Sequence, residues 1–186
     1  KEYNISDVAY TLSVGRKAFN YRKAVVCKDI EDCIKKLNYL NNSEEIYLNN
    51  VHDKRNVNFM FTGQGSQYMN MASDLYEKES VFKEEFDKCI NIVKSIIGID
   101  LKEILFKKNY EDDDEKFIAK TSITQPLIFI IEYCMSKLLI SMKIEPSAMI
   151  GHSLGEYVSA TISGVFSLED ALNVVCIRAK LMDSML

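Results

Sequence analysis

The sequence predicts an α/β fold in which helices cover a parallel sheet, preceded by a smaller α+β unit. Two short apolar runs, residues 57–61 and 147–150, have the character of strands, and each leads into a glycine-rich loop. Helical periodicity of apolar residues fills most of the chain between and after these runs. Strands that alternate with helices favour a parallel sheet, of which these 186 residues are expected to hold an incomplete part.

The smaller unit is assigned to residues 1–55. Its patterns predict a helix from Ser6 or Asp7 to about Gly15, a strand over 23–27, a helix over 29–40 and a possible strand over 46–48. Residues 41–55 are polar and rich in asparagine, which is typical of a connection. We therefore place the start of the larger unit at residue 56 and expect it to continue to residue 186.

The larger unit is expected to contain helices over about 72–97, 101–106, 126–141 and 168–186. The acidic run 111–115 is interpreted as a solvated loop. Neighbouring side chains of an extended segment point apart, and the run lacks the glycine and the alternating ligands of a calcium loop. We expect no metal site in the chain.

The most informative motif is Gly151-His152-Ser153-Leu154-Gly155, a G-x-S-x-G pentapeptide between an apolar run and a helical pattern. Strand, sharp turn and helix in this order predict a nucleophile elbow with Ser153 as the nucleophile; the alternative is an ordinary tight turn. Glycines on both sides of the serine avoid Cβ clashes in the strained turn. The helix N-terminus favours an oxyanion here, and the Leu154 N–H is one expected donor.

A second donor loop, Thr62-Gly63-Gln64-Gly65-Ser66-Gln67, follows the strand over 57–61. An oxyanion hole generally takes its second N–H from a separate loop, and Gln64 is the natural donor here. A phosphate-binding loop is the alternative interpretation. The segment lacks the Gly-Lys-Ser/Thr ending of such a loop and the third glycine of a dinucleotide fingerprint.

Arg178 interrupts an apolar stripe at helical spacing that consists of Ala171, Val174, Val175, Leu181, Met182 and Met185. An unpaired guanidinium on a buried face costs roughly several kcal/mol, so an internal carboxylate or a ligand carboxylate is expected to meet it. The alternative is a side chain that extends to the rim or bonds to loop carbonyls.

The remaining candidates are two histidines and a glutamine. His152 directly precedes Ser153, and because adjacent side chains diverge it is better suited to shaping a pocket than to acting as the general base. His52 is interpreted as a solvated connector residue. Gln125, beside Pro126 at an expected helix start, either lines the pocket or caps the helix.

Two sets of motifs resemble known synthase segments. The first set resembles the acyltransferase domains that load malonyl-type units onto carrier proteins in polyketide and fatty acid synthesis: Phe61–Gln67, Thr124-Gln125-Pro126 and Gly151–Tyr157. The second resembles the linker between ketosynthase and acyltransferase in modular polyketide synthases: residues 7–12, 15–19 and 21–26. The resemblance covers nearly the whole chain and implies an α/β-hydrolase-like core.

This resemblance implies a seryl acyl-enzyme cycle. Ser153 attacks the thioester of malonyl-CoA, the N–H groups of Gln64 and Leu154 hold the oxyanion, and Arg178 clamps the free carboxylate. Gln125 and His152 line the pocket. The acyl group then passes to the phosphopantetheine thiol of an acyl carrier protein. The domain itself binds no cofactor, and Leu154 after the serine favours malonyl over methylmalonyl.

The family's general-base histidine lies well downstream of the elbow and has no counterpart in these residues. We therefore expect the chain to be the N-terminal part of an acyltransferase that is inactive alone, with the rest of the domain and an adjacent ketosynthase as partners. Two other functions stay open. A serine hydrolase or thioesterase would use the same elbow with water as the acceptor, and a non-catalytic docking segment would not use it.

Composition narrows the class of protein further. A net charge of −4 offers no basic field for nucleic acid, and the longest apolar stretch, 126–144, is interrupted by charges, so no membrane span is expected. The N-terminus has no apolar core of a signal peptide. Five cysteines without C-x-x-C spacing indicate a reducing, cytoplasmic location.

Overall fold

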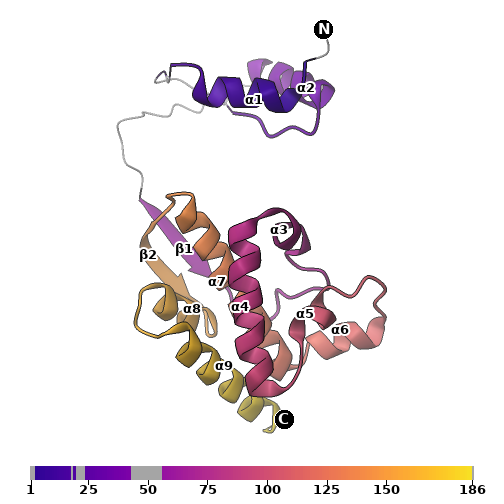
Figure 1. The fold of residues 1–186 in the computed structure, drawn as a ribbon, viewed down its shortest axis with the longest axis vertical. Coiled ribbons are helices and arrows are strands. Elements are labelled where there is room, and N and C mark those ends of the chain that lie inside the picture. The colour runs from indigo at the N-terminus through magenta and orange to yellow at the C-terminus, as the bar shows by residue number, and fades with distance from the viewer. Residues whose placement is uncertain (1–2, 18, 20–23, 43–55, 186) are drawn as a thin grey trace. The chain divides into compact units, whose positions relative to one another are not determined.

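The structure is a computed structural model that describes residues 3–17, 19, 24–42 and 56–185 (Figure 1). The chain divides into two compact units, Lys1–Arg55 and Asn56–Leu186. In the described part of the smaller unit, α1 (Ile5–Val14) and α2 (Ile30–Asn42) are the regular elements. Asn4, rather than Ser6 or Asp7, caps α1, since its side chain accepts a hydrogen bond from the Ser6 N–H at 2.9 Å.

The strand predicted over 23–27 is wrong for the residues that the structure describes. Residues 24–27 are irregular, and the Val26 carbonyl accepts a hydrogen bond from Lys36 Nζ at 2.8 Å. Val25 and Val26 are β-branched and therefore favour a strand. This preference takes effect only when a neighbouring strand is present to pair with them. The strand predicted over 46–48 and His52 lie outside the described residues.

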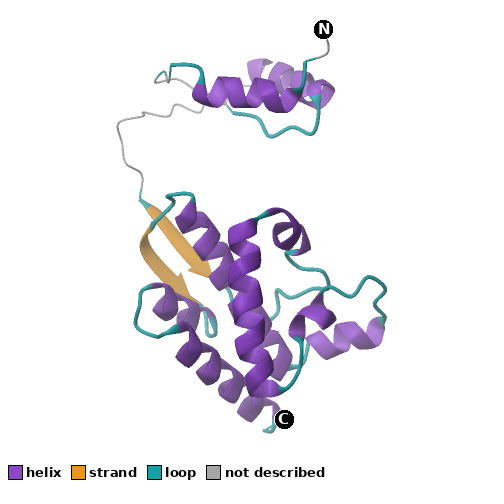
Figure 2. Cartoon of the chain, in the orientation of Figure 1, coloured by secondary structure: helices purple, strands orange, loops and turns teal. Residues whose placement is uncertain are grey.

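The larger unit contains a parallel pair of strands, β1 (Val57–Phe61) and β2 (Pro146–Gly151), as the sequence predicts (Figure 2). Phe59 pairs with Met149, and Phe61 pairs with Gly151. Parallel strands need a long crossover, and here it holds the following helices: α3 (Ser73–Lys78), α4 (Ser80–Ile97), α5 (Leu101–Leu105), α6 (Asp112–Ile118) and α7 (Thr121–Ser141). After β2 come α8 (Gly155–Ile162) and α9 (Leu168–Asp183).

The two faces of the strand pair have different environments. Phe59 and Phe61 point into the core, whereas Met60 is 80% exposed and its paired neighbour Ile150 is 60% exposed. Strand side chains alternate between faces, so one face carries the helices and the other is apolar and open.

Helix α7 is the centre of the core. Helices α4 and α9 pack on it and on each other, and α8 packs on α7 and on both strands (Figure 1). By length and composition α7 could span a membrane. However, 72% of the 18-residue apolar stretch that meets this criterion is buried within the unit. The predicted start at Pro126 is wrong, because α7 begins at Thr121 and holds Pro126 in its second turn. The missing proline N–H leaves the Ser122 carbonyl without its usual helical donor.

Two other element boundaries differ from the prediction. The helix expected over 72–97 is interrupted at Glu79, whose extended backbone separates α3 from α4. The acidic run is not a loop: Asp112–Glu115 form the first turn of α6, and Glu111 and Asp114 form a reciprocal capping box. Carboxylates at this position are stabilised by the N-terminal end of the helix dipole.

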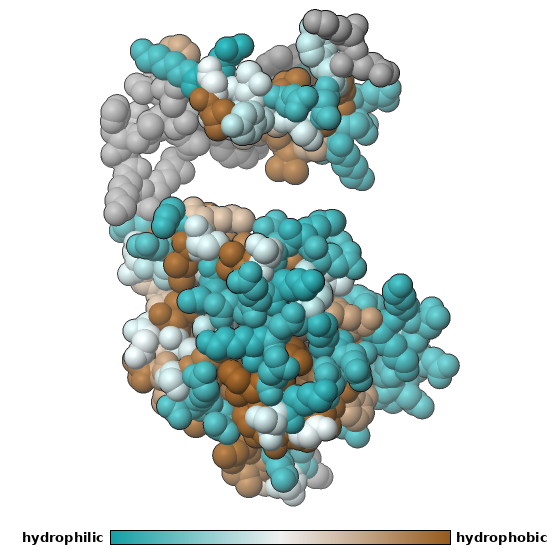
Figure 3. Space-filling model, in the orientation of Figure 1, coloured by the Kyte–Doolittle hydropathy of each residue, from teal (hydrophilic) through white to brown (hydrophobic). Residues whose placement is uncertain are grey.

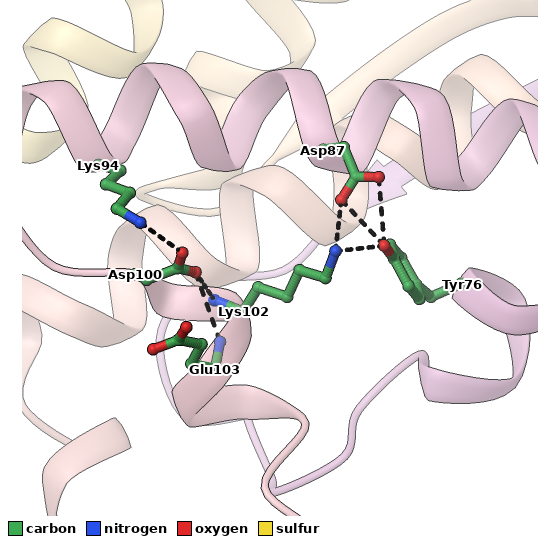
Figure 4. Close-up of polar contacts among 6 residues, drawn as sticks. All are labelled: Tyr76, Asp87, Lys94, Asp100, Lys102 and Glu103. Carbon is green, nitrogen blue, oxygen red and sulfur yellow. Dashed lines mark hydrogen bonds and ion pairs between the residues drawn. The ribbon is translucent and has the colours of Figure 1, made fainter.

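A polar cluster attaches α5 to α3 and α4 (Figure 4). Lys102 Nζ lies 2.8 Å from Asp87 Oδ1 and also donates to the Tyr76 hydroxyl, which in turn donates to Asp87. Asp100 caps α5 and pairs with Lys94 at 2.9 Å. Since Lys102 and Asp87 are more than one-third exposed, this cluster positions α5 more than it stabilises the unit.

Candidate active site

The G-x-S-x-G motif forms the sharp turn between β2 and α8. Ser153 has a left-handed backbone with φ of 53°, which is rare outside glycine, and its side chain is exposed. A Cβ on Gly151 would lie 2.1 Å from the Gly155 carbonyl carbon, and one on Gly155 would lie 2.6 Å from the Phe61 carbonyl oxygen. The glycines are therefore needed because β2, α8 and β1 approach one another at this turn.

The loop after β1 lies against the elbow. The His152 N–H donates to the Phe61 carbonyl at 3.0 Å, which extends the ladder beyond the last strand pair. A Cβ on Gly63 would come within 2.8 Å of His152 Nδ1. Among the hydrogen bonds of the described residues, none uses the backbone N–H of Gln64 or of Leu154. Both predicted oxyanion donors are thus free to bind a ligand.

Arg178 reaches the nucleophile from α9. Its Nη2 donates to Ser153 Oγ at 3.3 Å, its Nη1 donates to Gln125 Oε1, and its guanidinium lies 5.7 Å from the centre of the Tyr157 ring. These partners are neutral, and no carboxylate of the described residues forms an ion pair with Arg178. A guanidinium with neutral partners beside Oγ can receive an anionic ligand.

The apolar stripe predicted for α9 is only partly correct. The buried residues are Leu168, Ala171, Leu172, Val175, Cys176 and Ala179. Leu181 and Met182 are instead 59% and 40% exposed, and Met185 lies beyond the helix and is exposed. Arg178 consequently lies at the edge of the buried face, partly buried, rather than in its middle.

Gln125 belongs to the site and does not cap a helix. It is the fifth residue of α7 and is 2% exposed, and its amide accepts from Arg178 and donates to Gln64 Oε1 at 3.4 Å. The Gln64 side chain donates in turn to Thr121 Oγ1 at 3.3 Å. A continuous chain of polar contacts therefore joins the oxyanion loop to Arg178 and Ser153.

His152 is exposed, and its imidazole borders Gly63. Within the described part of the chain, the hydrogen-bond partner of Ser153 Oγ is Arg178 and not this histidine. This arrangement agrees with the interpretation that His152 shapes the loop contact rather than removing a proton from Ser153.

Three further residues contribute to this site and are not predicted by its motifs. Tyr157 stacks on Phe166 and supports the Arg178 guanidinium. Glu156 accepts the Gly151 N–H at 2.8 Å, and Glu132 accepts two hydrogen bonds from Thr62. One signal was available: Glu132 is a lone carboxylate within the apolar segment of α7.

Comparison with known proteins agrees with this geometry. The family described as "Acyl transferase domain" matches residues 58–186, and "CurL-like, PKS C-terminal" matches residues 1–37. A phenolphthiocerol/phthiocerol polyketide synthase of Mycobacterium tuberculosis is 35% identical over 190 residues, which cover 96% of this chain and 12% of that protein.

Two solved structures extend the comparison. The acyl transferase domain of ZmaA is 39% identical with a TM-score of 0.88, covering 98% of this chain and 42% of that one. A malonyl-transacylase solved in complex with a type II PKS acyl-carrier protein is 27% identical with a TM-score of 0.61, covering 71% of this chain and 40% of that one. This chain thus spans less than half the length of these relatives. It belongs to the acyl transferase domain family, among the acyltransferase domains of modular polyketide synthases.

Proposed function

We propose that this chain forms the nucleophile-bearing part of an acyltransferase that moves a malonyl unit from CoA to the phosphopantetheine thiol of an acyl carrier protein. The observation that carries the proposal is the position of Arg178, whose guanidinium bonds both to Ser153 Oγ and to Gln125. An arginine fork with neutral partners beside a nucleophile suits a substrate that carries a free carboxylate.

In the first half of the cycle, Ser153 Oγ attacks the thioester carbonyl while a general base takes its proton. The carbonyl oxygen becomes an oxyanion held by the N–H groups of Gln64 and Leu154. When the carbonyl re-forms, the carbon–sulfur bond breaks and CoA leaves as the protonated thiol. By family resemblance, the base is a histidine beyond residue 186.

In the second half, the carrier thiol attacks the seryl ester, its proton passes to the base, and Ser153 leaves with a proton. Each half forms one bond to the acyl carbon and breaks another, so the cycle needs no bound cofactor. The relative solved with its carrier protein supports this choice of acceptor. An adjacent ketosynthase, the neighbour that the linker resemblance of residues 7–12, 15–19 and 21–26 implies, would use the loaded carrier.

The test of the nucleophile is malonylation of Ser153 in the full-length protein, followed by mass spectrometry after incubation with malonyl-CoA. Ser153→Ala should abolish the adduct. Label that persists in the alanine variant would contradict the assignment.

The test of Arg178 compares malonyl-CoA with acetyl-CoA. Arg178→Ala should lower malonyl loading by about 30-fold or more, because loss of one partner of a partly buried charge pair costs about 2–5 kcal/mol. Acetyl loading should change by less than about threefold. Lys180→Ala removes an exposed charge from the same helix and is the matched control. Equal losses for both substrates would make Arg178 a structural residue.

A hydrolase would share the elbow and the oxyanion loop. The two functions differ in the fate of the acyl-enzyme, which should decay faster to a pantetheine thiol than to water. If the acyl-enzyme decays by hydrolysis and added thiol does not make it decay faster, the hydrolase is favoured.

A further inference from the structure

Glu132 is the one carboxylate of α7, a long apolar helix. It lies on α7 between Ile131 and Tyr133, both of which are buried. One oxygen, Oε1, accepts the Thr62 N–H at 2.6 Å and the Thr62 hydroxyl at 2.7 Å. The other oxygen, Oε2, is buried and has no partner among the described residues. A single residue far away in sequence thus supplies both of its hydrogen bonds.

This position is unfavourable for a carboxylate on its own. Burial raises the pKa of Glu132, and the two hydrogen bonds from Thr62 oppose this shift only in part. An apolar side chain of similar size would suit the α7 core better, because a carboxylate loses hydration when it is buried. The stability of the core therefore does not explain why a carboxylate stands here.

The contacted residue begins the oxyanion loop. Thr62 directly follows β1 and precedes Gly63 and Gln64. The Phe61 carbonyl, at the end of β1, accepts the His152 N–H. The backbone group that follows it, the Thr62 N–H, donates to Glu132. The Thr62 hydroxyl also lies 3.2 Å from Ser66 Oγ at the far side of the loop. Glu132 therefore holds both the backbone and the side chain of the residue from which the loop departs.

The same helix positions the other side of the site. Gln125, which accepts from Arg178, lies about two helical turns before Glu132 on α7. One rigid element thus contacts the loop that carries the oxyanion donor and the arginine beside the nucleophile.

We propose that Glu132 is a positioning residue that holds Thr62 so that the Gln64 N–H points at the oxyanion. This inference rests on the proposed function. Glu132 does not touch the substrate, and its effect passes through the backbone of Thr62-Gly63-Gln64. Its loss should slow acylation of Ser153 and leave the binding of malonyl-CoA unchanged, because an oxyanion donor acts mainly in the transition state.

The experiment compares Glu132→Leu with Glu132→Gln in the full-length protein, by rapid-quench malonylation of Ser153. Glu132→Leu removes the acceptor and should lower the acylation rate by about 100-fold, the usual effect of losing one oxyanion donor. Its KM for malonyl-CoA should stay within about threefold of the original. Glu132→Gln should keep a rate within about fivefold, because an amide oxygen can accept both hydrogen bonds from Thr62.

A matched control excludes a general effect on α7. Ser136→Ala removes a hydroxyl one turn later, which bonds to the Glu132 carbonyl at 2.8 Å, and should leave the rate unchanged. If Glu132→Leu does not fold, Thr62→Val and Thr62→Ser replace it. The valine variant loses the hydroxyl donor and should acylate about tenfold more slowly than the serine variant, which keeps it.

Three outcomes would overturn the inference: a Glu132→Leu rate close to that of the original protein, equal losses in the leucine and glutamine variants, or equal rates in the two Thr62 variants. A failure of the proposed function would look different: the unmodified protein would then form no Ser153 adduct, or would form one that decays to water without acceleration by a pantetheine thiol.

Discussion

At the scale of single residues, the site depends on close backbone approach. Ser153 is held in a left-handed conformation where β2 passes into α8, and Gly155 lies against the end of β1. Residues 151 and 155 have no room for a Cβ, although neither has an unusual positive φ. The requirement for glycine is therefore steric and comes from neighbouring elements.

Gly155→Ala should destabilise the protein by about 3 kcal/mol, because the new methyl would overlap backbone atoms that cannot rotate away. Chemical denaturation monitored by circular dichroism measures this loss. Gly164→Ala is the matched control. It has a φ of 81° and no heavy atom within 4 Å of the added Cβ, so only the conformational strain of about 1 kcal/mol is expected. Equal effects of the two substitutions would contradict the steric account.

At the scale of elements, the relative position of α7 and α9 depends on a cap that one helix provides for the other. Asp183, at the end of α9, accepts the N–H groups of Thr121 and Ser122 at 3.1 and 2.9 Å. These are the first two residues of α7, whose backbone donors have no partner within the helix. The cap also holds α9 where Arg178 meets Gln125.

Asp183→Ala should cost about 1 kcal/mol at neutral pH, the usual effect of removing a cap. The hydrogen bonds from Ser122, followed by those from Thr121, lower the pKa of Asp183. A carboxyl group with a lowered pKa stabilises the fold fully above its unfolded pKa of about 3.9 and loses this effect as the pH falls through its folded value.

Urea denaturation at pH 7 and at pH 3 checks both parts of this prediction. The difference between the original protein and Asp183→Ala should be largest at pH 7 and smaller at pH 3. Asp74→Ala, which removes a largely exposed carboxylate on α3, should change stability by less than about 0.5 kcal/mol at either pH. A difference for Asp183 that grows on acidification would contradict the capping role.

Much of this arrangement could be predicted from local sequence. Both strands and the elbow could be identified because glycine-rich turns follow short apolar runs, and parallel pairing then places the loops of Gln64 and Leu154 at the same sheet edge. The prediction of a solvated loop at residues 111–115 is wrong because the run of like charges hides a helix start, with Glu111 as N-cap and Asp114 three residues later. The stripe on α9 was misplaced because periodicity does not say which helix face its neighbours cover.

The contacts between distant elements could not be predicted. The bond from Arg178 to Gln125 joins residues 53 apart, and that from Thr62 to Glu132 joins residues 70 apart. Each depends on how α7 crosses its neighbours, which side-chain volume and tertiary packing decide. For the same reason, the sequence suggested that Arg178 needs a partner without indicating which residue supplies it.

At the scale of the whole molecule, the strand pair has an open apolar face. Hydrophobic side chains interrupt the hydrophilic surface in the view of Figure 3, and among the large hydrophobic residues of the strands Met60 and Ile150 are the most exposed. A contiguous apolar face of this kind favours association. The 186-residue chain by itself should therefore self-associate.

Met60→Lys combined with Ile150→Thr should shift the chain toward monomer in sedimentation velocity, with little loss of stability because both positions are exposed. Val165→Lys replaces a side chain that is 72% exposed outside the sheet and is the control that should not change association. A chain that is monomeric before any substitution would contradict the prediction.

The same isolated chain should also acylate slowly. It contains two histidines, and His152 makes no hydrogen bond to Ser153 within the described residues. General-base assistance is worth about 10²–10⁴ in rate, so malonylation of the 186-residue chain should be slower than that of the full-length protein by a factor in this range. Equal rates would make His52 the first residue to mutate.

The central position of α7 has a consequence for recombination between synthases. Thr121, Gln125 and Glu132 lie along this one helix and contact Gln64, Arg178 and Thr62 on two other segments, the oxyanion loop and α9. A hybrid domain whose crossover falls between Thr121 and Ser141 would take the two partners of at least one of these contacts from different parents. A crossover between the oxyanion loop and residue 121 would instead separate Thr62 from Glu132. It would keep Arg178 with Gln125. Libraries of hybrids should therefore retain activity most often when β1, its loop, the whole of α7 and α9 come from a single parent.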